Sequence, residues 1–202
     1  MYKSQVALIG GDTVRGPEFF AVSLQGIVAD NRYIPRAGAG LGDLIYVSGC
    51  LGDASYGREI IQQDQVVDAS QPLVKKFLYP APRVKQAKEL NEFASSMIDL
   101  SDGLYCDLGK IVFESDKGAC IDVSKLPISA TLNQFLGREK SIEKALIGGD
   151  DYELCFCVAP VNKGEIDRIS DQLNLPLTMI GQMDTTPGVW LIGESGDREE
   201  YK

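Results

Sequence analysis

The sequence predicts a mixed α/β (α+β) fold assembled from βαβ-like units. Short apolar runs that favour strands alternate along the chain with segments whose apolar residues recur at helical spacing. Of the 202 residues, 44% are hydrophobic, which is enough for one sizeable core or a core plus a fragment. No segment repeats at a fixed period and none is of low complexity.

The N-terminal part is expected to hold two strands and then a crossover. Val6–Ile9 is a short apolar run that ends in two glycines, and Phe19–Ala29 is rich in residues that favour strands. Asp30–Gly42 carries one proline and three glycines, which is typical of a linker or crossover. A domain that opens directly with a strand has little before it to pack against, so we expect a further segment N-terminal to this sequence.

The rest of the chain follows the same two patterns. Further strands are expected at Leu44–Val47, Ser96–Leu100, Ala119–Val123, Glu153–Val158, Leu177–Met183 and Val189–Ile192. Helices are expected at Ala54–Gln63, Gln71–Leu78, Arg83–Phe93, Ser129–Leu136 and Glu165–Leu173. One more helix follows Leu100, since Leu104, Leu108, Ile111 and Val112 fall on one helical face.

Charge and composition exclude several classes of function. Lys and Arg total 20 against 29 Asp and Glu, and this net charge of −9 argues against nucleic acid or an anionic membrane as the main partner. A phosphorylated substrate is compatible with it, because divalent cations bridge carboxylates to phosphates. The sequence has no histidine, which excludes histidine acid–base chemistry and His-containing zinc sites for this chain alone.

The cysteines and the hydropathy pattern indicate a reducing, aqueous compartment. Cys50, Cys106, Cys120, Cys155 and Cys157 form no CxxC pair, and we interpret all five as small buried hydrophobic residues. The last two are expected on one face of a strand. No apolar run approaches the ~20 residues that span a bilayer. We therefore expect a soluble cytoplasmic protein.

Three short segments share one design, in which an apolar or helical lead-in is followed by glycine and aspartate in a tight turn. They are Gly10-Gly11-Asp12-Thr13, Asp99-Leu100-Ser101-Asp102-Gly103 and Gly148-Gly149-Asp150-Asp151. Glycine permits unusual backbone angles and the close approach of a ligand. Carboxylates supply hard oxygen ligands, which suit Mg²⁺ better than softer metals. An N-cap or an Asp-Gly turn explains any one of these segments equally well.

The central segment lies at the junction of a predicted strand and a predicted helix. Asp99 and Asp102 are three residues apart, a spacing that places both carboxylates on one side of a helical turn. Ser101 and the first N–H groups of the helix can meet a phosphate oxygen. Two acids that face a nucleotide imply Mg²⁺ ions between them and its phosphates.

Other residues have weaker claims. Arg36 can clamp a phosphate, although a lone arginine in a loop is more often solvated. Asp53 is expected to be the N-cap of the helix that follows it. The chain contains no GxxxxGK[ST] motif, so it is not a P-loop enzyme.

Several stretches resemble signatures of thiamine-monophosphate kinases, in the same order and across nearly the whole chain. They are LIGGDTVRGP at 8–17, GDLIYVSG at 42–49, LGDA at 51–54, MIDLSDGL at 97–104 and GGDDYEL at 148–154. The family's own forms of the last two are MIDISDGL and GGEDYEL or GGDDYEL. The resemblance implies the PurM-like fold that aminoimidazole ribonucleotide synthetase and selenophosphate synthetase share. Residues 1–30 would then be the last strands of an N-terminal dimerisation domain, and residues 31–202 the C-terminal α/β domain.

The resemblance also implies a role for each matching residue. The Mg²⁺ ligands would be Asp12, Asp99 and Asp102, with Asp12 and Asp102 catalytic. The ATP-binding residues would be Gly11, Asp12, Arg36 and Ser101. The residues facing the thiamine moiety would be Asp150 and, as its neighbour, Asp151. Glu153 is interpreted as a strand residue without a role in the site.

The implied reaction transfers the γ-phosphoryl group of ATP to the phosphate of thiamine monophosphate, giving thiamine diphosphate and ADP. The acceptor phosphate is already ionised near neutral pH, so positioning and charge neutralisation by Mg²⁺ supply most of the catalysis. This fits a chain without histidine. The full-length family member is expected to be a homodimer.

The sequence departs from the family at both ends. The stretch with further metal-binding acids and most of the dimer interface has no counterpart here, and neither has the aromatic close of the type GWDHF. We therefore expect this chain alone to be poorly active, and the strands around Val6 and Phe19 to expose an apolar face that favours association. Two alternatives stay open, a superfamily relative that uses another acceptor and a non-catalytic module that binds nucleotide or metal.

Overall fold

A computed structural model describes residues 7, 9–13, 15–28, 33–63, 68, 71–193 and 197–200. The chain divides into two compact units, Met1–Tyr33 and Ile34–Lys202, and each is described by itself. In the first unit the described residues form neither a helix nor a strand. The expected strand at Phe19–Ala29 is therefore not found at 19–28, and Ala29 lies outside the described residues, as does Val6 of the other expected strand. A strand needs a hydrogen-bonded neighbour, and the described part of this unit offers none.

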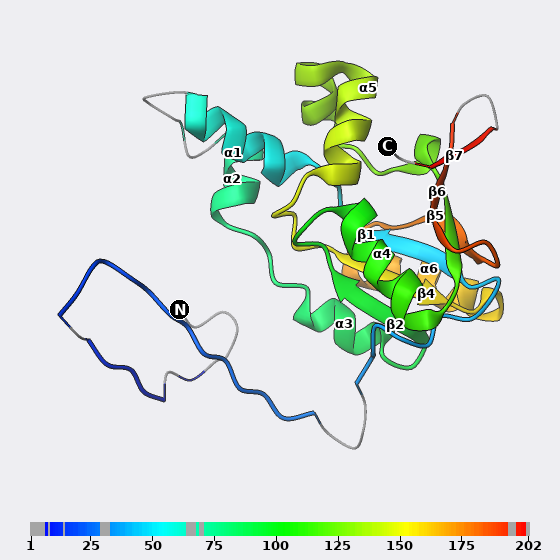
Figure 1. Ribbon diagram of the computed structural model, residues 1–202, viewed down its shortest axis with the longest axis horizontal. Helices are drawn as coiled ribbons and strands as arrows, with labels where there is room; N and C mark the ends of the chain where they lie inside the picture. Colours follow the sequence, from blue (N-terminus) through cyan, green and yellow to red (C-terminus); the bar gives the residue numbers. More distant parts are fainter. Residues whose placement is uncertain are drawn as a thin grey trace. The chain divides into compact units, whose positions relative to one another are not determined.

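A seven-stranded sheet forms the centre of the second unit (Figure 1). Its strands are β1 (Leu44–Ser48), β2 (Ala94–Asp99), β3 (Gly118–Asp122), β4 (Leu154–Val158), β5 (Leu177–Asp184), β6 (Gly188–Ile192) and β7 (Arg198–Glu200). Their order across the sheet is β2-β4-β1-β5-β3-β6-β7. The β3–β6 pair is parallel and the other neighbouring pairs are antiparallel. The mixed α/β class is confirmed, but the expected βαβ-like units do not produce a parallel sheet, because β1, β2 and β3 follow one another in the sequence without pairing.

The helices of the second unit lie where the apolar periodicity predicts them. They are α1 (Asp53–Gln63), α2 (Pro72–Leu78), α3 (Val84–Leu90), α4 (Leu104–Ser115), α5 (Ala130–Ile147) and α6 (Lys163–Leu173). Short 3₁₀ turns occupy Val123–Lys125 and Pro160–Asn162. Helix α5 extends well beyond the expected Leu136, and Gly137 (φ 76°, ψ 167°) interrupts its helical backbone. A left-handed residue cannot be read from apolar spacing, so the sequence predicted only the first part.

Two clusters of buried side chains hold the layers together, one on each face of the sheet. On one face Ile45 and Val47 of β1 pack with Leu108 and Ile111 of α4. On the other face the stacked rings of Tyr46 and Phe156 pack with residues of α3 and α6. Every residue of β4 is buried, because this inner strand is covered on both faces.

The cysteines divide between the core and the surface. Cys155 and Cys157 are buried in the same cluster as α4, as their alternation along β4 predicts. Cys50 and Cys120 are half-buried, and Cys106 is exposed on α4. The expectation of five buried cysteines is therefore wrong for Cys106, which lies on the outer side of a helix whose other side supplies the core.

Candidate functional site

Two of the three glycine- and aspartate-rich loops lie side by side. The first, at 99–103, starts at Asp99, the last residue of β2, and the second, at 148–153, precedes β4. The N–H of Asp150 donates to the carbonyl oxygen of Ser101 at 3.0 Å, and the N–H of Tyr152 donates to that of Leu100 at 2.8 Å. The N–H of Leu100 returns a bond of 2.8 Å to the carbonyl of Glu153. Because β2 and β4 are antiparallel neighbours, the end of one strand meets the start of the other.

The second loop has a backbone that only particular residues tolerate. A Cβ atom on Gly149 would lie 2.5 Å from the carbonyl oxygen of Ser101, so the two loops approach this closely only with glycine there. Asp150 (φ 70°) and Tyr152 (φ 50°) both have left-handed backbone angles. Such angles are strained for a tyrosine, and strain of this kind gathers at functional sites. The carboxylate of Asp150 pairs with Nη1 of Arg58 on α1 at 3.1 Å.

A buried carboxylate shapes the first loop. Oδ2 of Asp107, on α4, accepts the N–H groups of both Ser101 and Asp102 at 2.9 Å each. The backbone N–H groups of Ser101 and Asp102 are therefore engaged within the protein, whereas the expected contact of Ser101 and the first N–H groups of the helix with a phosphate stays a prediction. Helix α4 begins only at Leu104, after Gly103 (φ 108°), so Asp99 and Asp102 do not share a helical turn. Asp107 was not among the expected site residues, since an acid in the first turn of a helix is common.

Lys110 joins this loop to the helix. Its Nζ lies 2.6 Å from Oδ2 of Asp102 and 2.7 Å from Oδ1 of Asp107. The hydrogen bonds with these two carboxylates raise the pKa of Lys110, so it carries its charge at any physiological pH. The side chain of Asp107 is fully buried, whereas 59% of the Asp102 side chain is exposed.

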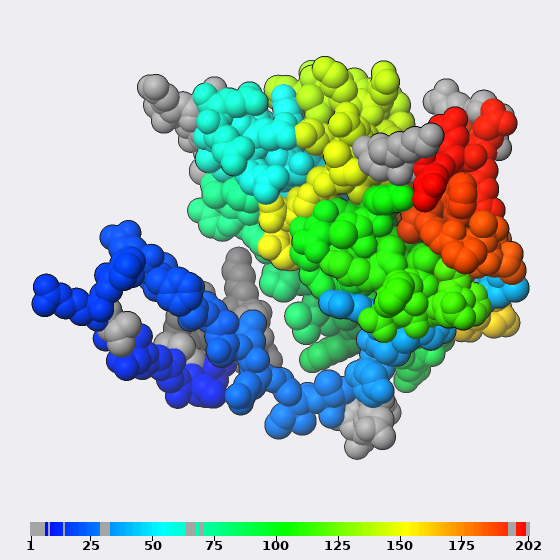
Figure 2. Space-filling view, in the orientation of Figure 1, coloured from blue at the N-terminus to red at the C-terminus, as the bar shows by residue number. Residues whose placement is uncertain are grey.

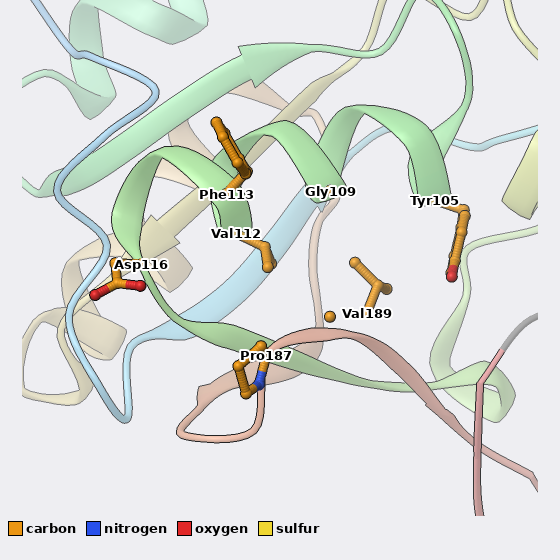
Figure 3. Close-up of a pocket in the computed structure, with 8 residues that line it drawn as sticks. Tyr105, Gly109, Val112, Phe113, Asp116, Pro187 and Val189 are labelled. Carbon is orange, nitrogen blue, oxygen red and sulfur yellow. The ribbon is translucent and has the colours of Figure 1, made fainter.

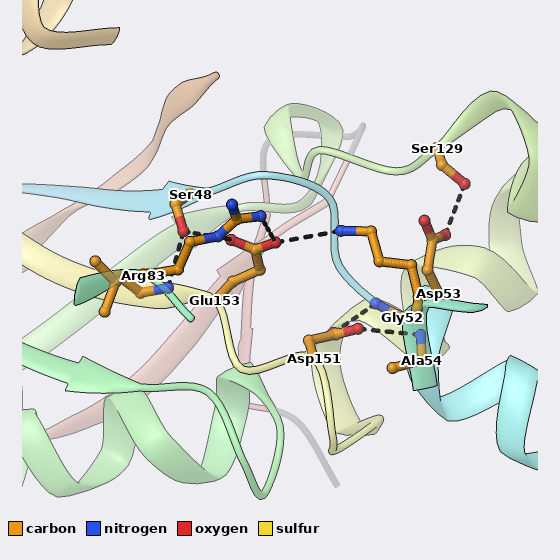
Figure 4. Close-up of polar contacts among 10 residues, drawn as sticks. Ser48, Gly52, Asp53, Ala54, Arg83, Ser129, Asp151 and Glu153 are labelled. Atoms are coloured by element: carbon orange, nitrogen blue, oxygen red, sulfur yellow. Dashed lines mark hydrogen bonds and ion pairs between the residues drawn. The ribbon is translucent and has the colours of Figure 1, made fainter. Parts of the chain in front are cut away.

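Asp151 is buried and caps helix α1. Its Oδ2 accepts the N–H of Gly52 at 2.7 Å, and its Oδ1 accepts that of Ala54 at 3.2 Å (Figure 4). Asp53 is not the N-cap that the sequence suggested, because its Oδ1 accepts the hydroxyl of Ser129 instead, at 2.6 Å. Burial raises the pKa of Asp151 to about 7, against the lowering effect of the two backbone hydrogen bonds. Both oxygens of the Asp151 carboxylate are therefore engaged in holding the start of α1.

Glu153 is the residue that the sequence interpretation passed over. Its carboxylate is buried and receives Nε and Nη2 of Arg83 at 2.7 and 2.5 Å, Nζ of Lys76 at 3.3 Å and the hydroxyl of Ser48 at 2.6 Å (Figure 4). A bidentate arginine pair of this kind holds both partners in one geometry. Glu153 thereby ties β1, α2 and the start of α3 to the second loop. Its cationic partners are 70 and 77 residues away, so no local spacing could reveal them.

The remaining expected site residues lie at the surface. Asp99 and Asp102 are exposed, and the yellow residues of the second loop reach the surface beside the green of α4 (Figure 2). Arg36 is exposed in the segment along the edge of β2, where the carbonyl of Pro35 accepts the N–H of Met97 at 3.0 Å. Asp12 belongs to the first unit, where its Oδ1 accepts the N–H of Thr13 at 2.7 Å.

The donor set of the first loop fits Mg²⁺. Among the described residues, no group of three or more acidic or cysteine side chains could hold a metal ion. Mg²⁺ does not need such a group, because it keeps several waters and binds one or two carboxylates together with substrate phosphates. Asp99 and Asp102 offer two exposed carboxylates on one loop, which suits this mode.

A separate apolar groove of about 400 Å³ lies between α4 and the turn into β6 (Figure 3). Val112 and Val189 point into the space between the two elements, and Tyr105 and Pro187 line its ends. No expected site residue lines it.

Within the described part of the chain, no helix is long and apolar enough to cross a membrane.

The protein has a mixed α/β fold, and its candidate site consists of two acidic loops joined by backbone hydrogen bonds. The chain belongs to the family of AIR synthase related protein, C-terminal domain, whose model matches residues 40–194. It is 47% identical over 179 residues to the thiamine-monophosphate kinase of Escherichia coli K12, an alignment that covers 87% of this chain and 55% of that protein. The chain therefore spans about half the length of the curated relatives it matches.

Solved structures agree with these sequence matches. The crystal structure of thiamine-monophosphate kinase from Stenotrophomonas maltophilia K279a has a TM-score of 0.77 at 39% identity, over 83% of this chain and 55% of that one. A structure described as AaThiL complexed with AMPPCP and TMP has a TM-score of 0.68 at 30% identity, over 84% of this chain and 52% of that one. The Escherichia coli hydrogenase maturation protein HypE shares the fold at 18% identity, with a TM-score of 0.67.

Proposed function

We propose that this chain is part of a Mg²⁺- and ATP-dependent kinase that phosphorylates thiamine monophosphate to thiamine diphosphate. The observation that carries the proposal is the junction of the two acidic loops, which brings the Asp99–Gly103 and Gly149–Glu153 segments together through backbone hydrogen bonds. The relatives named thiamine-monophosphate kinase support it, as does the relative whose structure is described as a complex with AMPPCP and TMP.

In this proposal the first loop handles the nucleotide. Asp99 and Asp102 would hold Mg²⁺ and Ser101 would bind ATP, while Arg36 at the edge of β2 would meet a phosphate. The resemblance also assigns ATP binding to Gly11 and both ATP and Mg²⁺ binding to Asp12 of the first unit, with Asp12 and Asp102 catalytic. Mg²⁺ bound there would neutralise the charge on the phosphates that are being brought together.

The second loop would handle the acceptor. Asp150 would face the thiamine moiety, since its carboxylate is partly exposed and its backbone conformation is fixed by the bond to Ser101. Asp151 was expected to contact the substrate as well, but its carboxylate is buried on the N-terminus of α1, so we assign it a positioning role. No side chain needs to remove a proton, because the acceptor phosphate is already ionised.

We further propose the organisation that the resemblance implies. Residues 1–30 would be the last part of an N-terminal dimerisation domain and residues 31–202 the C-terminal domain, in a homodimeric cytoplasmic protein. Its partners would be small molecules rather than nucleic acid, which the net charge of −9 supports.

The test is a calorimetric titration of the purified chain with ATP, with and without Mg²⁺, followed by an assay for thiamine diphosphate after thiamine monophosphate is added. We expect ATP binding that requires Mg²⁺ and is lost in Asp99→Asn. The control is Asp171→Asn, which removes an exposed carboxylate from α6 and should bind as the wild type does. Binding without product would indicate a nucleotide-binding module, and product from another phosphorylated acceptor would indicate a different superfamily activity. No binding at all would contradict the proposal.

A further inference from the structure

Lys110 places a positive charge against the acidic first loop. Its ammonium group bridges an exposed carboxylate, that of Asp102, and a fully buried one, that of Asp107. Lysine carries a compact charge with three donors, so one ammonium group can serve two carboxylates at once. Without this cation, two negative groups would face each other across the start of α4.

The buried partner fixes the position of the ammonium group. Oδ2 of Asp107 is held by the N–H groups of Ser101 and Asp102, so Oδ1 is the oxygen that receives Lys110. A buried carboxylate requires a partner for its charge, and this requirement keeps the lysine side chain folded back on α4. The same placement brings Nζ to 2.6 Å from Oδ2 of Asp102.

We propose that Lys110 is a built-in competitor of Mg²⁺ at Asp102, which weakens the binding of Mg²⁺ to this loop in the absence of nucleotide. The inference rests on the proposed function in so far as that function assigns Mg²⁺ to Asp102. An ion on the free oxygen of the carboxylate meets the nearby ammonium charge, and an ion on Oδ2 has to displace it. Phosphates supply further ligands and negative charge, so the metal binds together with the nucleotide.

The direct test is the affinity of the purified chain for Mg²⁺ without nucleotide, measured by calorimetry, with Mn²⁺ and electron paramagnetic resonance as a second probe. Lys110→Met should bind the ion roughly three- to tenfold more tightly than the wild type, which is the scale of a charge interaction between partly exposed groups. The matched control is Lys163→Met, because Lys163 makes a similar exposed pair with Asp167 on α6, at 2.8 Å. That control should leave the affinity unchanged. Equal affinities of Lys110→Met and the wild type, including no detectable binding by either, would overturn the inference.

A second measurement covers the case in which Lys110→Met does not fold. Nuclear magnetic resonance of wild-type chain labelled with ¹³C at the lysine ε-carbons follows each ammonium group, and Lys110→Arg assigns the signal. Addition of Mg²⁺ should shift the Lys110 signal saturably and leave that of Lys163 in place. A Lys110 signal that does not respond to Mg²⁺ would reject the inference.

These experiments separate the inference from the proposed function, since neither uses ATP or thiamine monophosphate. A chain that makes no thiamine diphosphate but shows the Lys110 effect would contradict the kinase and keep the competition. A chain that turns over substrate with unaltered Mg²⁺ affinity in Lys110→Met would do the reverse.

Discussion

The N–H of Asp150 donates to the carbonyl oxygen of Ser101 over a distance of 3.0 Å, although the two residues belong to loops on different strands. This bond and the two bonds of Leu100, with Tyr152 and Glu153, hold the two acidic loops together. The contact requires glycine at position 149, where the backbone of the second loop approaches that of the first.

Gly149→Ala should lower the free energy of unfolding by about 1–3 kcal/mol, since its Cβ would lie 2.5 Å from the Ser101 carbonyl oxygen and force the loops apart. Urea denaturation measures the effect. The control is Gly164→Ala on α6, where a Cβ meets no atom within 4 Å, and which should be neutral or slightly stabilising. Equal stability of Gly149→Ala and the wild type would show that the loops are not in contact.

Arg83→Met should destabilise the protein by about 3 kcal/mol, because it leaves the buried carboxylate of Glu153 without its bidentate partner. The matched control is Arg168→Met, whose Nε pairs with Glu165 at 2.8 Å on the exposed side of α6. An exposed pair of this kind contributes less than about 1 kcal/mol. The two variants should therefore differ clearly in urea denaturation, and similar losses would argue against a special role for Glu153.

The stability of the protein should depend on pH through Asp151. Burial raises the pKa of this carboxyl to about 7 in the folded state, above its usual value near 4. The folded state then holds the proton more tightly than the unfolded state between these two values. The contribution of Asp151 to stability is therefore greatest below about pH 4, falls as the pH rises and is constant above about pH 7.

Comparison with Asp151→Asn isolates this contribution from those of other groups. The difference in unfolding free energy between wild type and variant should shrink as the pH rises from about 4 to about 7. Asp171→Asn, on the exposed side of α6, should run parallel to the wild type. A wild-type curve parallel to that of Asp151→Asn would show that the carboxyl ionises normally despite its burial.

Asp107→Asn should loosen the first loop specifically. The neutral amide oxygen is a weaker acceptor for the N–H groups of Ser101 and Asp102, so their hydrogen exchange should become faster. The amide of Leu100 is bonded to the carbonyl of Glu153 instead and serves as an internal control. Uniformly faster exchange at all three amides would indicate a general loss of stability and no specific hold on the loop.

Local pattern predicted the helices and the strands β1 to β6 of the second unit, but it also predicted a strand at Phe19–Ala29 that the described residues do not form. The apolar face of α4 could be read from Leu104, Leu108 and Ile111, because helical spacing repeats within a few residues. The order of the strands could not, because β1 pairs with β4 and β5, more than 100 residues further along. The expected helix at Ser129–Leu136 ended next to the break at Gly137, and the continuation of α5 to Ile147 was missed.

In the candidate site too, local motifs could be predicted from the sequence and distant partners could not. The glycine and aspartate motifs indicated both loops, but the sequence did not predict that the loops join through the bond between Asp150 and Ser101. The residues that hold these loops were missed or assigned differently, because Asp151 caps a helix 97 to 99 residues earlier and Glu153 receives a lysine 77 residues away. Sequence motifs identify exposed groups, whereas buried carboxylates find their partners only through the fold.

The backbone hydrogen bonds between the loops also restrict how these loops can move. Segments fixed to two adjacent strands of a covered sheet do not swing open and shut independently. If an enzyme of this architecture encloses its substrates during the reaction, the moving part must be supplied by some other segment. The acidic loops would then stay fixed while the other segment closes over nucleotide and acceptor.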